Sequence, residues 1–137
     1  MTAKEYLSQI RKLEQSIRWY DTEIDRNRLS LLPGAVRYDT DRVQTSPEDK
    51  LAAVAVRIEE LRLKQMQKRQ ELSQLRDKIV AELMTINAKR AEVLYLRYVR
   101  GMRYERIALT LTYSVDHVKR LHGWGLKEFE RKVIRKQ

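Results

Sequence analysis

The chain has 137 residues, a length that allows one or two small domains. Hydrophobic residues make up 42% and charged residues 35%, so only a modest core is expected. The absence of cysteine excludes disulfide bonds and thiolate metal sites. The first residues lack the apolar run of a signal peptide, and no apolar stretch approaches the roughly 20 residues of a membrane span. We therefore expect a cytoplasmic protein with no membrane contact.

The positive charge of the chain is concentrated near its C-terminus. The net charge is +10 at pH 7. Residues 88–137 contain thirteen Lys and Arg against five Asp and Glu, a net charge of +8, whereas residues 1–87 carry a net charge of +2. A basic terminal domain favours a polyanionic partner, and we expect double-stranded DNA. The alternative is a solvated helical surface.

Residues 3–31 are predicted to form one amphipathic helix. Its apolar side chains recur at steps of three and four, the spacing of a single helical face. They are Leu7, Ile10, Leu13, Ile17, Tyr20 and Ile24. Pro33 and Gly34 end this helix, because proline cannot continue the backbone hydrogen bonds. A polar linker is expected over residues 33–47.

A second and longer helix is predicted over residues 48–86. Ser46 is placed to cap it and Pro47 suits its first turn. Eight of eleven heptad positions are aliphatic, which indicates a coiled-coil seam. These positions are Leu51, Val54, Ile58, Leu61, Gln65, Lys68, Leu72, Leu75, Ile79, Glu82 and Ile86. Gln65 and Lys68 either specify register or oligomeric state, or mark where the seam faces solvent.

The two helices together predict a long antiparallel helical hairpin or coiled coil, which would form an interaction arm over residues 1–87. The first helix is shorter by about ten residues, so part of the long seam needs another partner. The side chains concerned are Leu72, Leu75, Ile79 and Ile86. A homodimer would cover them, and cover by the C-terminal helices is the alternative.

Residues 88–137 are predicted to form a small helical domain. A helix over 88–99, capped by Thr85 or Asn87, ends at Arg100 and Gly101. A short helix follows over 102–109, then a turn over 110–113. A last helix begins at Val115, because Ser114 is well placed as its N-cap.

The apolar spacing of this domain predicts a helix-turn-helix. Ala108 is a small residue where two helices would cross, Val118 follows ten positions later, and Leu121 lies three further on. Leu111 would fill the turn between the two helices. In such a motif the second helix enters the major groove with its first residues over the base edges. A generic three-helix packing with the same spacing is the alternative.

The same region resembles region 4 of sigma-70 factors. The resemblance is carried by VLYLRY at 93–98, YERIA at 104–108 and LTYSVDHVKRL at 111–121. With Tyr6-Leu7 near the start and VQTSP at 43–47, the layout of nearly the whole chain is similar to small phage and prophage regulators of late transcription, of the RinA and ArpU kind. The resemblance implies that Val115, Asp116, Lys119 and Arg120 read a promoter element.

The expected DNA-binding residues combine this implication with the charge pattern. Lys and Arg can donate to guanine, and Asp can accept from cytosine. The exposed start of the last helix, with His117 and His122 beside it, would face the bases, and basic residues elsewhere would contact phosphates. The full set is Val115, Asp116, His117, Lys119, Arg120, Arg103, Arg131 and Lys132.

Two positions depart from the region-4 pattern. Thr112 stands at a turn position where many members carry glycine, so a positive φ would be strained there. Gly123-Trp124-Gly125 interrupts the last helix, where glycine is unfavourable. We expect this helix to end or kink after His122, with Trp124 pinning the tail to the core.

The sequence thus predicts an all-α transcription regulator of phage type that binds promoter DNA and contacts RNA polymerase or a second copy of itself. A small terminase-like DNA packaging protein is the main alternative, since it too joins a helix-turn-helix to coiled-coil helices. A third reading is an adaptor that docks on polymerase without binding DNA. We expect no enzymatic activity, no metal and no cofactor, because no catalytic or ligand spacing is present.

Overall fold

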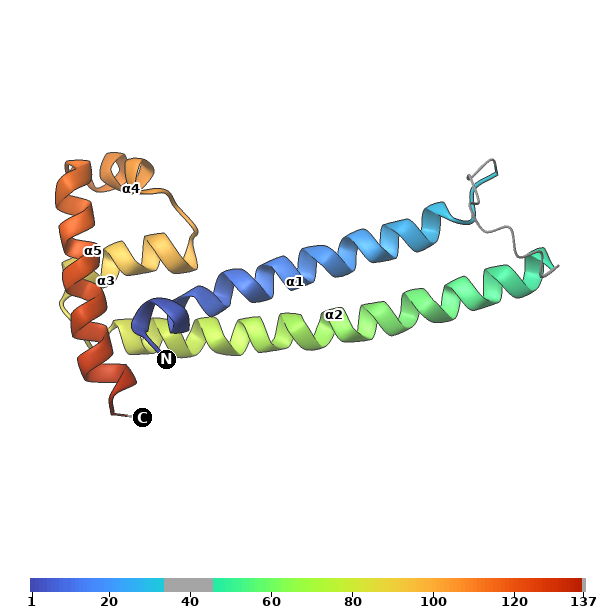
Figure 1. The fold of residues 1–137 in the computed structure, drawn as a ribbon, viewed down its shortest axis with the longest axis horizontal. Coiled ribbons are helices and arrows are strands. Elements are labelled where there is room, and N and C mark those ends of the chain that lie inside the picture. The colour runs from blue at the N-terminus through green and yellow to red at the C-terminus, as the bar shows by residue number, and fades with distance from the viewer. Residues whose placement is uncertain (34–45, 137) are drawn as a thin grey trace. The chain divides into compact units, whose positions relative to one another are not determined.

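The fold is helical throughout the part of the chain that the computed structural model describes, residues 1–33 and 46–136. No strand occurs in these ranges, so the expected all-α class is confirmed. The helices are α1 (Ala3–Leu29), α2 (Pro47–Leu83), α3 (Ala88–Leu94), α4 (Tyr104–Leu111) and α5 (Val115–Phe129). Two π-helical segments, η1 (Tyr95–Val99) and η2 (Glu130–Ile134), continue α3 and α5 (Figure 1). Most of the expected linker over 33–47 lies outside the described residues.

Side-chain caps set where three of the helices begin. The backbone N–H groups of Asp49 and His117 donate to the hydroxyls of Ser46 and Ser114, each at 3.1 Å. The side chain of Asn87, one of the two candidates for its helix, accepts from the first turn of α3. These contacts satisfy N–H groups that have no partner inside a helix. The predicted caps at Ser46 and Ser114 are confirmed.

The chain divides into two compact units. Unit 1 comprises Met1–Glu14 and Glu71–Gln137, and unit 2 comprises Gln15–Gln70. Residues 71–87 therefore belong to the same compact unit as α3, α4 and α5. The expected division into an arm over 1–87 and a DNA-binding domain over 88–137 is a statement about function and stays a prediction.

In unit 2 the two long helices run antiparallel to each other. Lys50 Nζ on α2 donates to the backbone carbonyl of Ser30, just after α1, at 2.9 Å. Further along α2, Gln65 Nε2 donates to the carbonyl of Ile17 at 3.1 Å and to Asp21 Oδ1 at 2.6 Å. Gln65 is only 8% exposed, so the polar position in the seam does not face solvent. It bridges the helices at one register, because a shift would leave its buried amide unpaired.

The surplus seam residues lie in unit 1 and are covered within the chain. Leu72, Ile79 and Ile86 are buried and Leu75 is half-buried, so no second copy is needed to cover them. Their burial agrees with the alternative of intramolecular cover. In the same unit the Tyr6 ring of α1 lies 5.9 Å from the Phe129 ring of α5, centre to centre. These residues therefore give no support to a homodimer.

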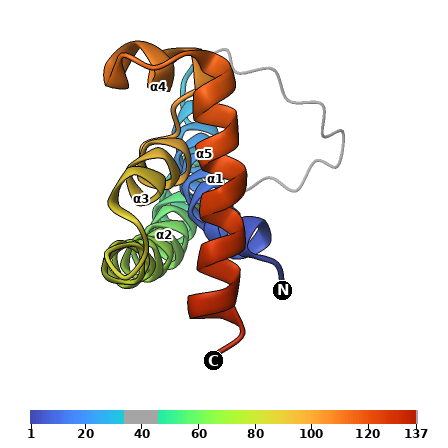
Figure 2. The ribbon, with the colours of Figure 1, turned by 90° about the vertical axis from the view of Figure 1, so that its left-hand side faces the viewer.

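The last helix does not end after His122. α5 runs unbroken to Phe129, and Trp124 is 46% exposed, so the expected kink and the pinning role of Trp124 are both wrong. The reason lies in packing between helices. A Cβ atom on Gly125 would come within 3.2 Å of the Leu94 side chain, so glycine lets α5 approach α3 closely (Figure 2).

A buried carboxylate also joins α5 to the start of α3. Glu128, whose side chain is 9% exposed, accepts from the backbone N–H of Asn87 at 3.1 Å, from Arg90 at 3.3 Å and from Lys132 at 3.1 Å. Burial alone would raise the pKa of Glu128, but the hydrogen bond from Asn87 and the two cations outweigh it, so the pKa lies below its ordinary value. The carboxylate is thus ionised and fully engaged at neutral pH.

The two helical glycines of α5 offer a matched pair of substitutions. Gly123→Ala should raise the free energy of unfolding by up to about 1 kcal/mol, because no atom lies within 4 Å of the added Cβ and alanine favours the helix. Gly125→Ala should be less stable than Gly123→Ala, since the buried Leu94 must move to admit the methyl group. Urea denaturation of both variants measures the difference, and equal stabilisation would contradict the close approach of α5 to α3.

Candidate nucleic-acid interface

The start of α5 is held by a small apolar core in unit 1. This core comprises Val93, Ile107, Ala108, Val118 and Leu121, each at most 5% exposed. Three of these residues are the ones that the helix-turn-helix spacing singled out. Their packing places α4 beside the N-terminal end of α5, as Figure 2 shows. Leu111 packs against the same core at the turn.

The turn between α4 and α5 depends on one left-handed residue. Thr112 has φ 56° and ψ 41°, and the next backbone N–H, that of Tyr113, donates to the carbonyl of Ala108 at 2.9 Å. Among the described residues, Thr112 is the sole non-glycine residue with positive φ. A branched side chain makes this left-handed backbone conformation strained, as the sequence predicts for a residue other than glycine at this position.

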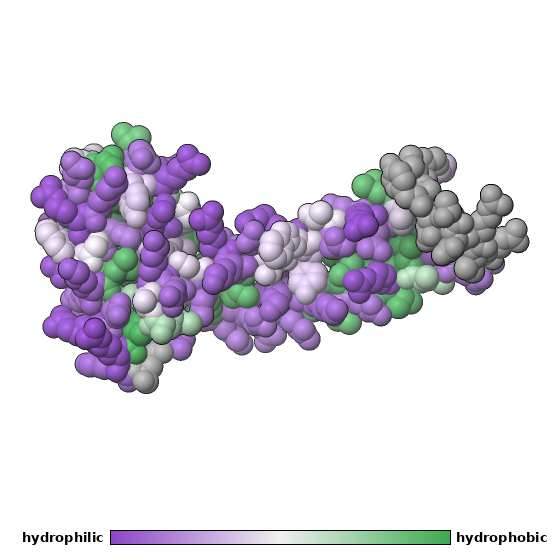
Figure 3. Space-filling model, in the orientation of Figure 1, coloured by the Kyte–Doolittle hydropathy of each residue, from purple (hydrophilic) through white to green (hydrophobic). Residues whose placement is uncertain are grey.

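Three of the expected base-reading side chains share the exposed face of the first turns of α5. Asp116, Lys119 and Arg120 are all exposed. The Arg120 Nε donates to the backbone carbonyl of Asp116 at 3.5 Å, so the guanidinium lies along the helix. Hydrophilic residues predominate over the face of unit 1 that Figure 3 presents. The helix start therefore offers two cations and one carboxylate to a partner.

The two remaining expected readers on α5 lie partly inward. Val115 packs against the apolar core, and the His117 ring meets the ring of Tyr113 edge-on, with centres 4.9 Å apart. Both residues are half-buried. They therefore serve to seat the helix start, and the exposed surface there belongs to Asp116, Lys119 and Arg120.

The other three expected DNA-binding residues are dispersed. Arg103 is exposed and directly precedes α4. Arg131 lies on η2, four helical turns beyond the start of α5. Lys132, also on η2, pairs with Glu128 at 3.1 Å, so its charge is matched within the protein.

A cationic cluster around Tyr104 was not predicted from the sequence. The Arg97 guanidinium lies 4.4 Å and Lys119 Nζ 6.0 Å from the centre of the Tyr104 ring. The face of an aromatic ring attracts cations, so Tyr104 orients both groups. Arg97 comes from η1 and Lys119 from α5, and nothing in their sequence spacing signals that they meet.

His122 lies in the packing beneath this surface, although the sequence placed it beside the exposed readers. Its Nε2 is 2.8 Å from the hydroxyl of Tyr98, and the ring of Tyr104 meets it edge-on. Burial, then the charges of Arg97 and Lys4, lower the pKa of His122 to about 4. Burial raises the pKa of Tyr98 to about 12. Both partners are therefore uncharged at neutral pH.

Two other classes of site find no support in the described ranges. Among residues 1–33 and 46–136, no three His, Asp or Glu side chains are grouped so as to hold a metal ion. No described helix has both the length and the apolar character needed to cross a membrane.

Replacing Thr112 with glycine should stabilise the protein by up to about 1 kcal/mol, because the left-handed strain it removes exceeds the extra backbone entropy that glycine loses on folding. Thr110→Gly is the matched control. Thr110 lies within α4, so the same substitution there should destabilise by up to about 1 kcal/mol. Thermal and urea unfolding report both values. A loss of stability in Thr112→Gly would mean that its backbone is not left-handed in solution.

The lowered pKa of His122 predicts a loss of stability in mild acid. Between about pH 6.5 and about pH 4 the unfolded chain binds a proton at this histidine and the folded chain does not, so folding weakens as the pH falls through this window. His122→Gln, which keeps a hydrogen-bonding group and cannot titrate, should lack this contribution. Urea titrations of both proteins at about pH 7 and about pH 5 give the comparison. Parallel losses of stability would show that His122 does not carry the effect.

Among known proteins, no family model, no curated protein and no solved structure matches the chain.

Proposed function

We propose that the chain is a sequence-specific DNA-binding transcription regulator of phage or prophage type. In this proposal α4 and α5 form a helix-turn-helix like that of sigma-70 region 4, and the start of α5 reads a promoter element. The α1 and α2 helices form an antiparallel coiled-coil arm that contacts RNA polymerase or a second copy.

The arrangement of α4, Thr112 and α5 is the observation that carries this proposal. Ala108 and Val118 pack in one core, and Ser114 caps a helix whose first exposed side chains include Lys119 and Arg120. A recognition helix needs these features, since its N-terminal turns must stand clear of the domain that supports them. The net charge of +8 over residues 88–137 favours a polyanion at the same surface.

A protein partner for the arm is supported by an apolar stripe in unit 2. Val56, Leu63 and Met66 are spaced by seven and three residues on α2 and are 59%, 53% and 64% exposed. At 100° per residue they fall on the side of α2 opposite Leu61 and Gln65, which are buried. A stripe of this kind is typical of a helix that packs against a second protein.

Substitutions at the start of α5 test the DNA-binding proposal. Arg120→Ala and Lys119→Ala should each reduce discrimination between a selected DNA site and random duplex, by about 1–3 kcal/mol where the side chain makes a bidentate base contact. Arg26→Ala in α1, whose side chain is 80% exposed, removes the same charge far along the sequence and should leave discrimination unchanged. Competition binding with the full-length chain measures all three variants.

The outcomes separate the candidate functions. Uniform loss of affinity for every sequence in the two α5 variants would refute base reading at this helix. Absence of DNA binding altogether would leave the adaptor reading. Genome-wide mapping of bound sites then distinguishes regulation from packaging, since a regulator occupies positions upstream of promoters and a packaging protein occupies a single packaging site.

A further inference from the structure

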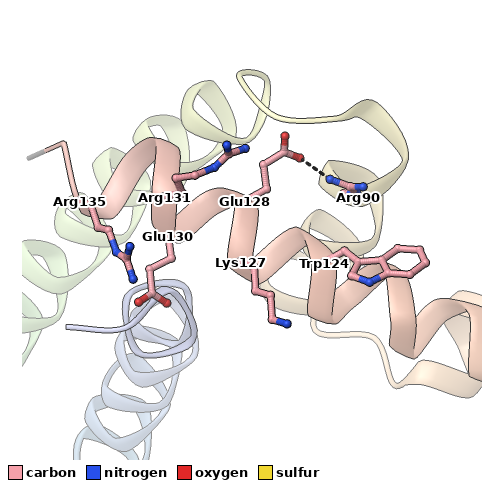
Figure 4. A pocket seen from close by; sticks show the side chains of 7 residues that line it. All are labelled: Arg90, Trp124, Lys127, Glu128, Glu130, Arg131 and Arg135. Carbon is pink, nitrogen blue, oxygen red and sulfur yellow. Dashed lines mark hydrogen bonds and ion pairs between the residues drawn. The ribbon is translucent and has the colours of Figure 1, made fainter.

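A basic groove with an aromatic wall lies at the C-terminal end of α5 in unit 1, on residues that the proposed DNA contact does not use, apart from Arg131, which was expected to contact phosphate. Its volume is about 480 Å³. The lining residues come from α3, from the continuous α5–η2 helix and from Arg135 directly after it (Figure 4). They are Arg90, Trp124, Lys127, Glu128, Glu130, Arg131 and Arg135. Trp124, Lys127, Arg131 and Arg135 follow at steps of three and four residues and so share one side of the helix.

The wall of the groove is preorganised by the ion pair beneath it. Arg90 is held by Glu128 at 3.3 Å, the contact drawn as a dashed line in Figure 4, and its guanidinium lies 5.8 Å from the centre of the Trp124 ring. The Arg90 guanidinium therefore lies within cation–π range of the indole. An indole that is 46% exposed offers a large apolar contact to a partner.

The charges of the groove favour an anionic partner. Four cationic side chains line it against two carboxylates, and the charge of Glu128 is already balanced by Arg90 and Lys132. Lys127, Arg131 and Arg135 remain against Glu130, so the groove keeps an excess of positive charge. A ligand that matches this surface carries several negative charges and one apolar group at the end of them that meets Trp124 (Figure 4).

The DNA proposed for the start of α5 is not the best occupant. Asp116 and Arg131 are fifteen residues apart on one continuous helix, which corresponds to about 22 Å at 1.5 Å per residue. Trp124 itself is eight residues from Asp116, about 12 Å along the helix, and the major groove is about 8.5 Å deep, so a helix that enters it by its N-terminus leaves it before the Trp124 groove.

We propose that the Trp124 groove binds an acidic peptide segment of a protein partner, with one aromatic or aliphatic side chain seated against the indole. The carboxylates of that segment pair with Lys127, Arg131 and Arg135. The inference rests on the groove alone and does not depend on what the start of α5 binds.

A pair of labelled peptides tests this assignment on the full-length chain. One is a short peptide of Glu and Gly with a single Phe near one end, and the other has Ser in place of Phe. Fluorescence polarisation should show the Phe peptide binding about tenfold more tightly, and Trp124→Ala should abolish that difference, as removal of an aromatic anchor does. Because Trp124 is largely exposed, its substitution should leave the fold intact, which circular dichroism checks.

A charge-matched pair of variants controls for the basic character of the whole protein. Arg131→Glu with Arg135→Glu should weaken both peptides strongly, and Arg26→Glu with Arg28→Glu, on α1, should weaken them only slightly for the same change in net charge. Equal binding of the two peptides, or equal effects of the two double variants, would overturn the proposal. It would also fall if Trp124→Ala reduced affinity for random DNA duplex as much as for the Phe peptide. Loss of sequence preference in Arg120→Ala with peptide binding unchanged supports two independent surfaces.

Discussion

The buried carboxylate of Glu128 is the interaction on which the arrangement of unit 1 depends. An ion taken out of water is costly unless charged and hydrogen-bonding partners surround it. Glu128 has three such partners, and two of them, the Asn87 backbone and the Arg90 side chain, belong to the first turn of α3 or its cap. The carboxylate therefore fixes where α5 lies along α3. Gly125 and Leu94 can meet only at this register, so the electrostatic contact and the close packing reinforce each other.

Because its position is fixed, α5 contributes to the core and to two separate surfaces. Its inner side supplies Val118, Leu121 and Phe129 to the core. Its outer side carries the exposed cations of the proposed DNA contact at one end and the Trp124 groove at the other. The helical period keeps these sides apart, since residues three and four positions apart share a face. A change that rotates α5 would disturb the core and both surfaces together.

The structure could be predicted best where it depends on contacts between residues that are neighbours in the chain. The caps at Ser46 and Ser114 were predicted because a side chain and the N–H groups it satisfies are neighbours in the chain. The all-helical class followed from apolar periodicity in the same way. The approach of Ala108 to Val118 was also predicted, because the spacing of a short helix-turn-helix leaves few ways to bury both.

The errors concern contacts between segments far apart in sequence. The sequence marks Gly125 as a weak point of the helix, because Leu94, whose close packing requires glycine there, lies thirty-one residues earlier. The heptad pattern leaves open whether a second chain or the C-terminal helices cover Ile79, because its cover within unit 1 comes from residues distant in the sequence. The groove around Trp124 was missed for the same reason, although the stripe of Trp124, Lys127, Arg131 and Arg135 was a signal available in the sequence.

The contact between Tyr6 and Phe129 has a consequence for how the protein is made. The two rings lie 5.9 Å apart, yet Phe129 is synthesised more than a hundred residues after Tyr6. At about 5–20 residues per second, roughly six to twenty-five seconds separate them on the ribosome. During that interval the start of α1 and the covered part of α2 lack the helix that completes their core. Unit 1 can close only after Phe129 has been synthesised, so a chaperone that shields Leu7 and Ile79 has its window before that point.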